Sequence, residues 1–69
     1  MKIIIINNTI LSLENVRRVD KYESHNKKEM HGITITYCDN EEEHCYFNYD
    51  DSAYLNNIFE SIAIKLSED

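Results

Sequence analysis

The sequence predicts an α+β fold in which an antiparallel sheet of about four strands carries one C-terminal amphipathic helix on one face. Three observations predict this class. One long segment near the C-terminus has helical periodicity, two segments in the middle alternate apolar and polar residues, and the N-terminal third consists of short β-branched runs separated by asparagine-rich turns. With 69 residues, of which 42% are hydrophobic, we expect a single domain over residues 1–69, near the lower size limit for one core.

The predicted helix covers about residues 50–66. Its apolar positions recur at steps of three and four and therefore form one stripe: Leu55, Ile58, Phe59, Ile62 and Leu66. Asp50 or Asp51 suits the N-cap position, because a carboxylate accepts hydrogen bonds from the free amides of the first turn. Lys65 lies near the C-terminal end, where the helix dipole favours a cation. We expect the upstream apolar residues to pack beneath this helix.

Two short strands are predicted before residue 14. Ile3–Ile6 is a continuous β-branched run, which is typical of a strand buried on both faces. Asn7-Asn8-Thr9 favours a turn, because asparagine tolerates a positive φ. Ile10–Leu13 then predicts a second strand that forms a hairpin with the first.

A third strand is predicted over about Val16–Glu23, after a break near Glu14-Asn15. Apolar residues in this region are spaced by three, and such a spacing does not form a helical stripe. The basic residues of this strand are interpreted as its solvent face: Arg17, Arg18 and Lys21. Ser24–Met30 is polar and has no periodicity, so it predicts a loop.

The middle of the chain predicts a second hairpin. Ile33, Ile35 and Tyr37 alternate with polar residues, and so do Cys45, Phe47 and Tyr49 on the far side of an acidic turn over residues 39–43. One register places both apolar sets on one face: Ile33 opposite Tyr49, Ile35 opposite Phe47, Tyr37 opposite Cys45, Thr36 opposite Tyr46, and Cys38 opposite His44. We expect the helix stripe to cover this apolar face.

The first strand and the helix also indicate exposed aliphatic side chains. If Ile3 and Ile5 face the helix, Ile4 and Ile6 point to the uncovered face of the sheet. Ile64 lies opposite the helix stripe. Contiguous exposed aliphatic residues favour an interface, so we expect a homodimer.

The net charge of −6 is unevenly distributed. Residues 1–37 carry six basic and four acidic side chains, whereas residues 38–69 carry one basic and nine acidic side chains. An acidic protein gains nothing from counterion release on DNA or RNA, so the sequence predicts no direct nucleic-acid binding. The asymmetry favours head-to-tail self-association or an acidic face that binds a basic partner.

The residues capable of chemistry do not form a recognisable catalytic or metal motif. Cys38 and His44 are predicted cross-strand neighbours, with His25, His31 and Cys45 within reach, but the spacings are not those of a zinc site. The predicted register places the two cysteines on opposite faces, which disfavours a disulfide. The single glycine excludes a glycine-rich phosphate loop. We therefore predict a protein that is not an enzyme and has no cofactor or metal.

The pattern resembles a group of small uncharacterised bacterial β-rich domains with a C-terminal helix. The shared features are an Ile/Leu-x-Leu-x-Asn-Val/Ile segment at Ile10 to Val16, an alternating hairpin from Ile33 to Tyr49, and an acid-capped helix from Asp51 to Leu66. The final strand–strand–helix unit also resembles the closing half of a pleckstrin-homology-like fold. The chain is too short for all seven strands of that fold, and its phosphoinositide loop has no counterpart here.

These observations favour a small, acidic, cytoplasmic protein-interaction module of bacterial or phage type, with a protein partner and no membrane span. The first alternative is an acidic inhibitor that mimics nucleic acid and occupies a basic nucleic-acid-binding protein. The second alternative is a metal- or redox-responsive protein. The candidate partner-binding residues are Asp39, Glu41, Glu42, Glu43, Tyr46, Asp50, Asp51 and Tyr54.

Overall fold

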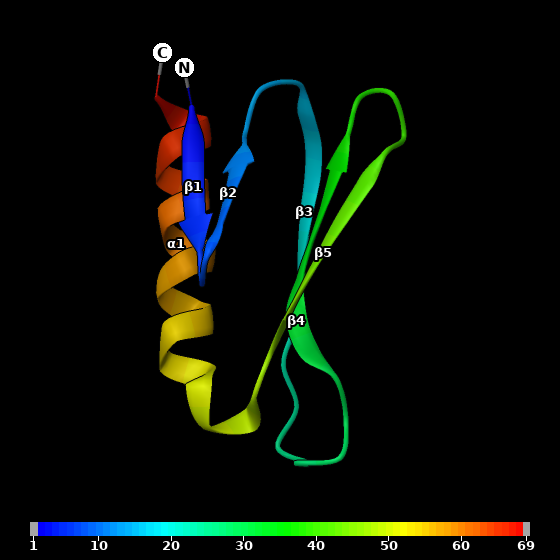
Figure 1. Cartoon of the computed structure of the whole chain (residues 1–69), viewed down its shortest axis with the longest axis vertical. Coiled ribbons are helices and arrows are strands. Elements are labelled where there is room, and N and C mark those ends of the chain that lie inside the picture. Colours follow the sequence, from blue (N-terminus) through cyan, green and yellow to red (C-terminus); the bar gives the residue numbers. More distant parts are fainter. Residues whose placement is uncertain (1, 69) are drawn as a thin grey trace.

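The computed structural model describes residues 2–68 and confirms the α+β class, with antiparallel strands followed by one C-terminal helix (Figure 1). The elements in chain order are β1 (Ile3–Ile6), β2 (Thr9–Ser12), β3 (Val16–Tyr22), β4 (His31–Tyr37), β5 (Glu42–Phe47), the 3₁₀ turn η1 (Tyr49–Asp51) and α1 (Ser52–Ser67). The five strands form two sheets rather than one, because β1 pairs only with β2 while β3, β4 and β5 form a separate three-stranded sheet.

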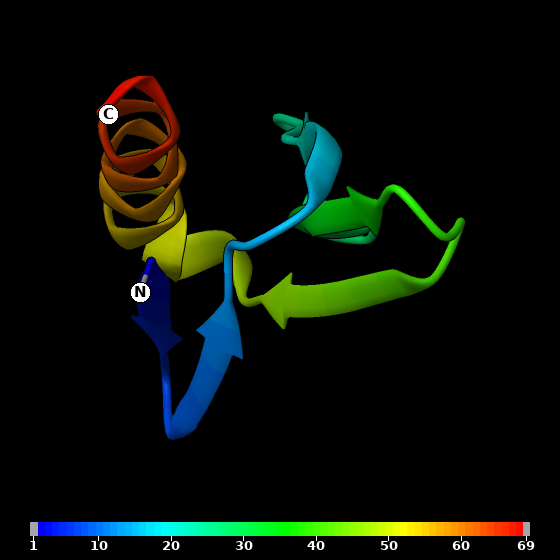
Figure 2. The ribbon, with the colours of Figure 1, turned by 90° about the horizontal axis from the view of Figure 1, so that it is seen from above.

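The helix, the β1–β2 hairpin and the three-stranded sheet surround a common core. Seen from above, α1 and the hairpin lie on one side and the β3–β4–β5 sheet lies on the other (Figure 2). The start of β1 and the end of α1 lie at the same end of the molecule (Figure 1), where the Lys2 ammonium donates to the Glu68 carbonyl. All three units contribute buried side chains to one cluster, which includes Ile6, Ile35 and Leu55.

The first hairpin has the predicted position but the opposite orientation. Asn7 adopts a φ of 54°, and the two-residue loop places Ile6 opposite Thr9. Ile4 and Ile6 are buried, whereas Ile3 and Ile5 are exposed. The predictions that β1 is buried on both faces and that Ile4 and Ile6 point outward are therefore wrong. A two-stranded ribbon with one covered face buries only alternate residues of a strand.

A bulge changes the face assignment of β3. Val16 lies opposite Tyr37 and Arg18 lies opposite Thr36, so Arg17 is the extra residue. After the bulge, Val19 and Lys21 lie on the same side of the sheet as the core residues of β4. Lys21 is exposed, as predicted, but it lies on the α1 side of the sheet, so the three basic residues do not share one face.

The β4–β5 hairpin keeps the predicted faces but has a different register. Ile33 lies opposite Cys45 instead of Tyr49, a shift of four residues. Asn40, with a φ of 70°, closes a tight turn in which its N–H donates to the Tyr37 carbonyl. A turn with a left-handed residue in this position determines the register. Because the shift is an even number, each side chain stays on its predicted face.

The helix packs as predicted. Leu55, Ile58 and Ile62 are buried and Phe59 is half-buried, so the apolar stripe covers the core. Leu66, which was assigned to the same stripe, lies near the end of α1 and is exposed. Asp51 occupies the N-cap position but its side chain forms no capping hydrogen bond, since η1 leads directly into the first turn.

Two residues of α1 connect the helix to its neighbours. The Asn56 amide donates to the Glu23 carboxylate at 2.9 Å, and its oxygen accepts from the Lys21 ammonium, which joins α1 to β3. On the other side, the Tyr54 hydroxyl accepts a hydrogen bond from the Asn7 N–H at 3.0 Å, which joins α1 to the β1–β2 hairpin.

Candidate interaction surfaces

The predicted acidic residues lie in two groups that are far apart. Asp39 and Glu41 lie in the β4–β5 turn and Glu42 and Glu43 begin β5, whereas Asp50 and Asp51 lie in η1. The β4–β5 turn and η1 occupy opposite ends of the long axis (Figure 1). The predicted residues therefore do not form one continuous acidic surface.

The two tyrosines assigned to the acidic surface have different environments. The Tyr54 ring packs against Phe47 with 5.6 Å between the ring centroids, and its hydroxyl is bonded to the hairpin. Tyr54 therefore has a structural role. Tyr46 lies on the outer face of the three-stranded sheet, away from α1, and is 61% exposed.

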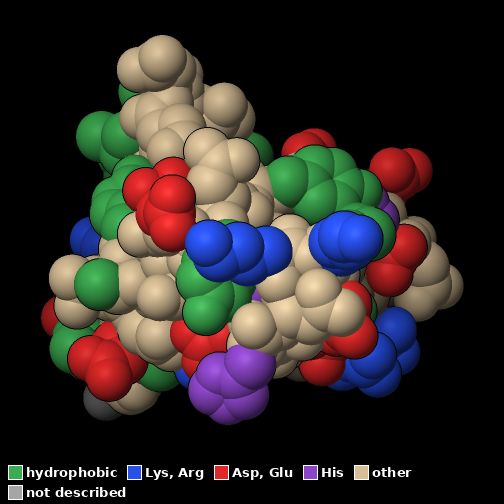
Figure 3. All heavy atoms as spheres, turned by 90° about the horizontal axis from the view of Figure 1, so that it is seen from below, with side chains coloured by type: hydrophobic (Ala, Val, Ile, Leu, Met, Phe, Trp, Pro, Cys, Tyr) green, Lys and Arg blue, Asp and Glu red, His purple; other side chains and the backbone are tan. Residues whose placement is uncertain are grey.

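The η1 end of the molecule carries charges of both signs. The Lys27 ammonium lies 5.6 Å from the centroid of the Tyr49 ring, which is adjacent in sequence to Asp50. Viewed from this end, acidic, basic and histidine side chains are intermixed with hydrophobic ones (Figure 3). Asp50 and Asp51 therefore belong to a mixed surface.

The residues considered for metal binding are separated. His44 lies opposite Thr34, not opposite Cys38, and both cysteines are free. His31 is buried and holds the loop that precedes β4, because its Nδ1 accepts from the Ser24 N–H and its Nε2 contacts the Asn26 carbonyl, each at 3.3 Å. Within residues 2–68, no group of three or more potential ligands is placed to hold a metal ion. The pairing that suggested a metal site is therefore not present.

The outer face of the three-stranded sheet carries aromatic and polar side chains in ordered rows. The rows across β3, β4 and β5 are Tyr22–Gly32–Tyr46, Asp20–Thr34–His44 and Arg18–Thr36–Glu42. In the first row, two tyrosines flank a residue without a side chain. No helix covers this face, since α1 packs on the other side of the sheet (Figure 2).

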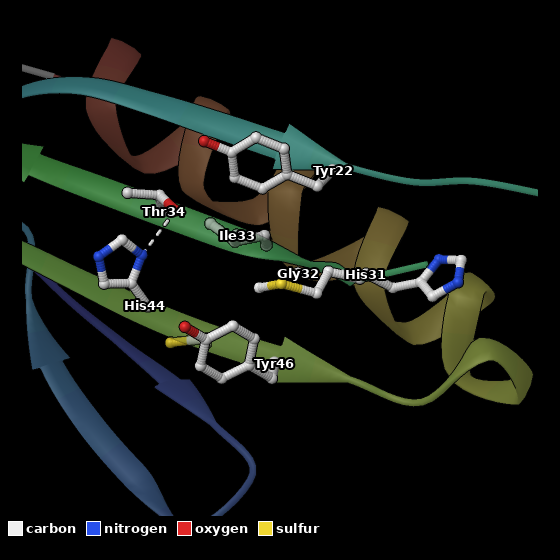
Figure 4. A pocket seen from close by; sticks show the side chains of 9 residues that line it. Tyr22, His31, Gly32, Ile33, Thr34, His44 and Tyr46 are labelled. Carbon is white, nitrogen blue, oxygen red and sulfur yellow. Dashed lines mark hydrogen bonds between the residues drawn. The ribbon is translucent and has the colours of Figure 1, made fainter. Parts of the chain in front are cut away.

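A hollow of about 190 Å³ lies over the first row (Figure 4). We call it the tyrosine hollow and define it by Tyr22, Met30, Gly32, Thr34, His44 and Tyr46. Tyr22 is 49% exposed and Tyr46 is 61% exposed, and Met30 is also exposed. Both tyrosine hydroxyls point along the strands toward the row that contains Thr34 and His44 (Figure 4). These exposed side chains around one hollow make it a candidate binding site.

Gly32 allows the two neighbouring strands to approach closely. A Cβ atom at this position would lie 2.4 Å from the Cys45 carbonyl oxygen, which is closer than any real contact. The sheet geometry therefore requires glycine. Gly32 also adds no side chain of its own between Tyr22 and Tyr46.

The polar groups around the tyrosine hollow are paired with one another. Thr34 Oγ1 and His44 Nδ1 are hydrogen-bonded at 3.0 Å, and the His44 ring stacks on Tyr46 with an interplanar angle of 12°. Further along the sheet, Arg18 Nε donates to the Asp20 carboxylate at 2.8 Å. This hydrogen bond and the charge of Asp20 raise the pKa of Arg18 above its usual value.

Cys45 also lines the hollow, from the core side of β5. Burial raises the pKa of its thiol above the usual value, and the negative charge of Glu43 raises it further. A reactive cysteine requires a lowered pKa. The thiol is therefore in an environment that suppresses nucleophilic chemistry.

Sequence reasoning did not identify this site, although it identified Tyr46. Tyr22, Met30 and Gly32 were assigned to a strand, a loop and a strand start, and no pattern connected them. The site is recognisable only once Tyr22, Gly32 and Tyr46 are known to lie in one row. That row depends on the registers of the β3–β4 and β4–β5 pairs. The predicted register placed Tyr46 opposite Thr36 and so separated it from Gly32.

Two other exposed apolar features lie elsewhere. Ile3, Ile5 and Ile10 are exposed on the outer face of the β1–β2 hairpin, where Ile5 lies opposite Ile10. A shallow groove of about 250 Å³ lies between β3 and α1 and includes Val19 and Leu66. The predicted homodimer remains a prediction, and the hairpin face is the aliphatic surface that it would use.

Comparison with known proteins identifies no relative. No protein-family model matches the chain, and no curated protein or solved structure matches it at a significant level. The resemblance to the closing half of a pleckstrin-homology-like fold therefore stays a prediction. Among residues 2–68, no helix is long and apolar enough to span a lipid bilayer.

Proposed function

We propose that this chain is a non-enzymatic protein-interaction module that binds its partner with the outer face of the β3–β4–β5 sheet. The tyrosine hollow receives one side chain of the partner. The observation that carries this proposal is the pair of exposed tyrosines on either side of Gly32. Tyrosine is among the residues that contribute most to binding energy when they surround a pocket near the centre of an interface.

The size of the tyrosine hollow supports side-chain recognition. Its volume is about 190 Å³, whereas pockets for drug-sized ligands and cofactors usually have volumes of about 300–1,000 Å³. Tyr22 and Tyr46 lie on either side of the hollow (Figure 4), and both side chains are substantially exposed. A single large side chain suits such a space better than a complete small-molecule substrate does.

The chemistry of the lining residues supports binding rather than catalysis. The Thr34 and His44 side chains are hydrogen-bonded to each other. Burial and the charge of Glu43 raise the pKa of the Cys45 thiol. A catalytic nucleophile requires the opposite shift together with a free base. The two exposed tyrosines therefore carry the proposed function.

Affinity capture with matched variants tests this proposal. The full chain is immobilised as wild type, as Tyr46→Ala and as Ile64→Ala, in which Ile64 has the same exposed fraction of 61% but lies on the solvent face of α1. Loss of a central aromatic residue costs at least about 2 kcal/mol, so we expect Tyr46→Ala to lower partner recovery more than tenfold and Ile64→Ala to leave it unchanged. Circular dichroism confirms that each variant is folded.

The same experiment distinguishes the proposed function from the alternative of an acidic inhibitor that mimics nucleic acid. Asp39→Asn and Glu41→Gln together remove charge from the β4–β5 turn without changing the tyrosine hollow or the rows of the outer sheet face. A partner whose capture depends on these two residues and is unaffected by Tyr46→Ala would contradict the proposed surface.

A further inference from the structure

We propose that the side chain received by the tyrosine hollow is an arginine from a basic segment of the partner. This inference rests on the proposed function and identifies the chemical class of the ligand. Its basis is the juxtaposition of two exposed aromatic side chains and hydrogen-bond acceptors around one small hollow, on a sheet face whose rows carry two carboxylates and one guanidinium.

The spacing of the two tyrosines suits a flat group. Tyr22 and Tyr46 lie on β3 and β5, which are separated by one intervening strand, β4. Two strand spacings amount to about 9.5 Å between the outer backbones, and Gly32 places no side chain between them. The guanidinium group of arginine is planar and stacks on aromatic faces, whereas the lysine ammonium is a compact, strongly hydrated charge.

Hydrogen-bond acceptors lie at one end of the tyrosine hollow. The hydroxyls of both tyrosines point toward the row that contains Thr34 and His44 (Figure 4). Thr34 is buried and its Oγ1 is hydrogen-bonded to His44 Nδ1 at 3.0 Å, so the acceptors on exposed side chains at this end are the two tyrosine hydroxyls. Arginine has five N–H donors and no acceptor, so these two hydroxyl oxygens complement it.

The charges on the outer face also favour a cation. None of the described residues that line the tyrosine hollow is lysine or arginine. Arg18 lies two rows away and is paired with Asp20, while Glu42 of the same row contributes a further negative charge. Together the three rows carry two carboxylates, Asp20 and Glu42, and one guanidinium, Arg18. A basic segment is therefore attracted to this face, and a nucleic acid, with its phosphate charges, is repelled.

NMR titration of the isotope-labelled full chain tests the inference. The probes are four capped tripeptides, Ala-X-Ala, in which X is arginine, citrulline, lysine or leucine. Citrulline has nearly the same shape as arginine but no charge. We expect the arginine peptide to shift the amide resonances of Tyr22, Gly32 and Tyr46, with affinity at least fivefold higher than that of citrulline and at least threefold higher than that of lysine.

Two variants test whether the arginine peptide binds at the tyrosine hollow. Tyr46→Leu keeps an apolar side chain but removes the aromatic ring, and we expect it to weaken arginine binding at least threefold while leaving leucine binding unchanged. Ile64→Ala serves as the control, since Ile64 lies on the solvent face of α1, and it is expected to change neither affinity.

The outcomes distinguish this inference from the proposed function. If leucine shifts the same three resonances with equal or higher affinity than arginine, the arginine assignment is overturned and the interaction module stands. Equal binding of lysine, or shifts centred on residues 39–43, would also overturn the arginine assignment. If none of the peptides shifts the resonances of Tyr22, Gly32 or Tyr46, two proposals are rejected: that the ligand is arginine, and that the tyrosine hollow receives a side chain of the partner.

Discussion

Gly32 and Asn40 show how single residues determine the geometry of the outer sheet face. Asn40 adopts a left-handed conformation in the β4–β5 turn, and this turn sets which residues of the two strands lie opposite each other. Gly32 then lies opposite Tyr46, where it allows close approach of β5. Neither residue is a member of the core cluster, yet both decide where Tyr46 is placed.

We predict that Gly32→Ala lowers the free energy of unfolding by about 1–3 kcal/mol, the usual cost of forcing an extra methyl group into a filled space. The reason is that the new Cβ would meet the Cys45 carbonyl oxygen at 2.4 Å, and a backbone atom cannot move aside independently. Urea denaturation followed by circular dichroism measures the change. The control Asn57→Ala, at an exposed helix position, is expected to stay within about 0.5 kcal/mol of wild type. Equal midpoints for Gly32→Ala and wild type would contradict the prediction.

The two thiols are predicted to react at different rates. Cys38 is exposed in the β4–β5 turn, whereas burial and then Glu43 raise the pKa of the half-buried Cys45 thiol. Only the thiolate attacks a disulfide reagent, so Cys45 is expected to react at least tenfold more slowly than Cys38 at pH 7.5. The Cys38→Ala and Cys45→Ala variants, assayed with a chromogenic disulfide reagent, measure each rate separately. The prediction fails if the two rates are the same.

At the scale of elements, the two sheets are held together by few polar contacts. Tyr37 at the end of β4 donates its hydroxyl hydrogen bond to the Ser12 carbonyl of β2 at 2.7 Å. Asn56 and Tyr54 join α1 to β3 and to the first hairpin, respectively. The hairpin β1–β2 depends on these contacts and on its buried aliphatic residues, because an isolated two-stranded hairpin is only marginally stable.

We predict that Tyr37→Phe lowers the free energy of unfolding by about 0.5–1.5 kcal/mol at pH 7, because the hydrogen bond to Ser12 is lost. Burial, followed by the charges of Glu43 and Cys45, raises the pKa of Tyr37 above its usual value of 10.0. The contribution of the phenol to stability is therefore complete below pH 10 and is lost as the pH rises through the folded-state pKa. Denaturation of both proteins between pH 7 and pH 11 should show the difference becoming smaller at high pH.

The matched control for this experiment is Tyr22→Phe, since Tyr22 is a half-exposed tyrosine on the outer face of the sheet. Its stability is expected to stay within about 0.5 kcal/mol of wild type at pH 7. A constant difference between wild type and Tyr37→Phe across the whole pH range would contradict the linkage argument.

At the scale of the whole molecule, two of the exposed apolar surfaces lie on separate faces. One is the tyrosine hollow, and the other is the hairpin face formed by Ile3, Ile5 and Ile10. The molecule is small, with principal extents of 36 × 22 × 21 Å, so each face is a substantial part of its surface. The proposed partner site and the surface of the predicted self-association therefore do not overlap.

We predict concentration-dependent self-association through the hairpin face. The association is expected to be weak, because three isoleucines contribute only part of the roughly 800 Å² per partner that a stable interface buries. Sedimentation equilibrium should give an average mass that rises above the monomer mass of 8.2 kDa with concentration. Added salt should increase the effect, since it screens the repulsion between chains of charge −6.

The variant Ile5→Thr keeps a β-branched side chain in β1 while making its exposed surface polar, and it is expected to restore a constant monomer mass. Ile64→Ala, on the solvent face of α1, should leave self-association unchanged. A monomer mass for the wild-type chain at all concentrations would refute the predicted homodimer.

The periodicity of individual segments predicted much of the fold. The helix with Leu55, Ile58 and Ile62 on its buried side, and the faces of β4 and β5, were predicted correctly. The run Ile3–Ile6 was assigned to the wrong orientation because four identical residues have no alternation that could identify the buried face. The bulge at Arg17 was also not predicted, because no local pattern in this chain distinguishes a bulge from a regular strand.

The sequence by itself determined which segments form strands and helix and which sides of β4, β5 and α1 are apolar, because these properties depend on repeats of two or 3.6 residues within one segment. Only the tertiary structure decided the register of β4 with β5, the division into two sheets, and the meeting of Tyr22 and Tyr46 across Gly32. The physical reason is that a shift by an even number of residues keeps every side chain on its face. The choice among such registers was made by the backbone conformation of the turn at Asn40.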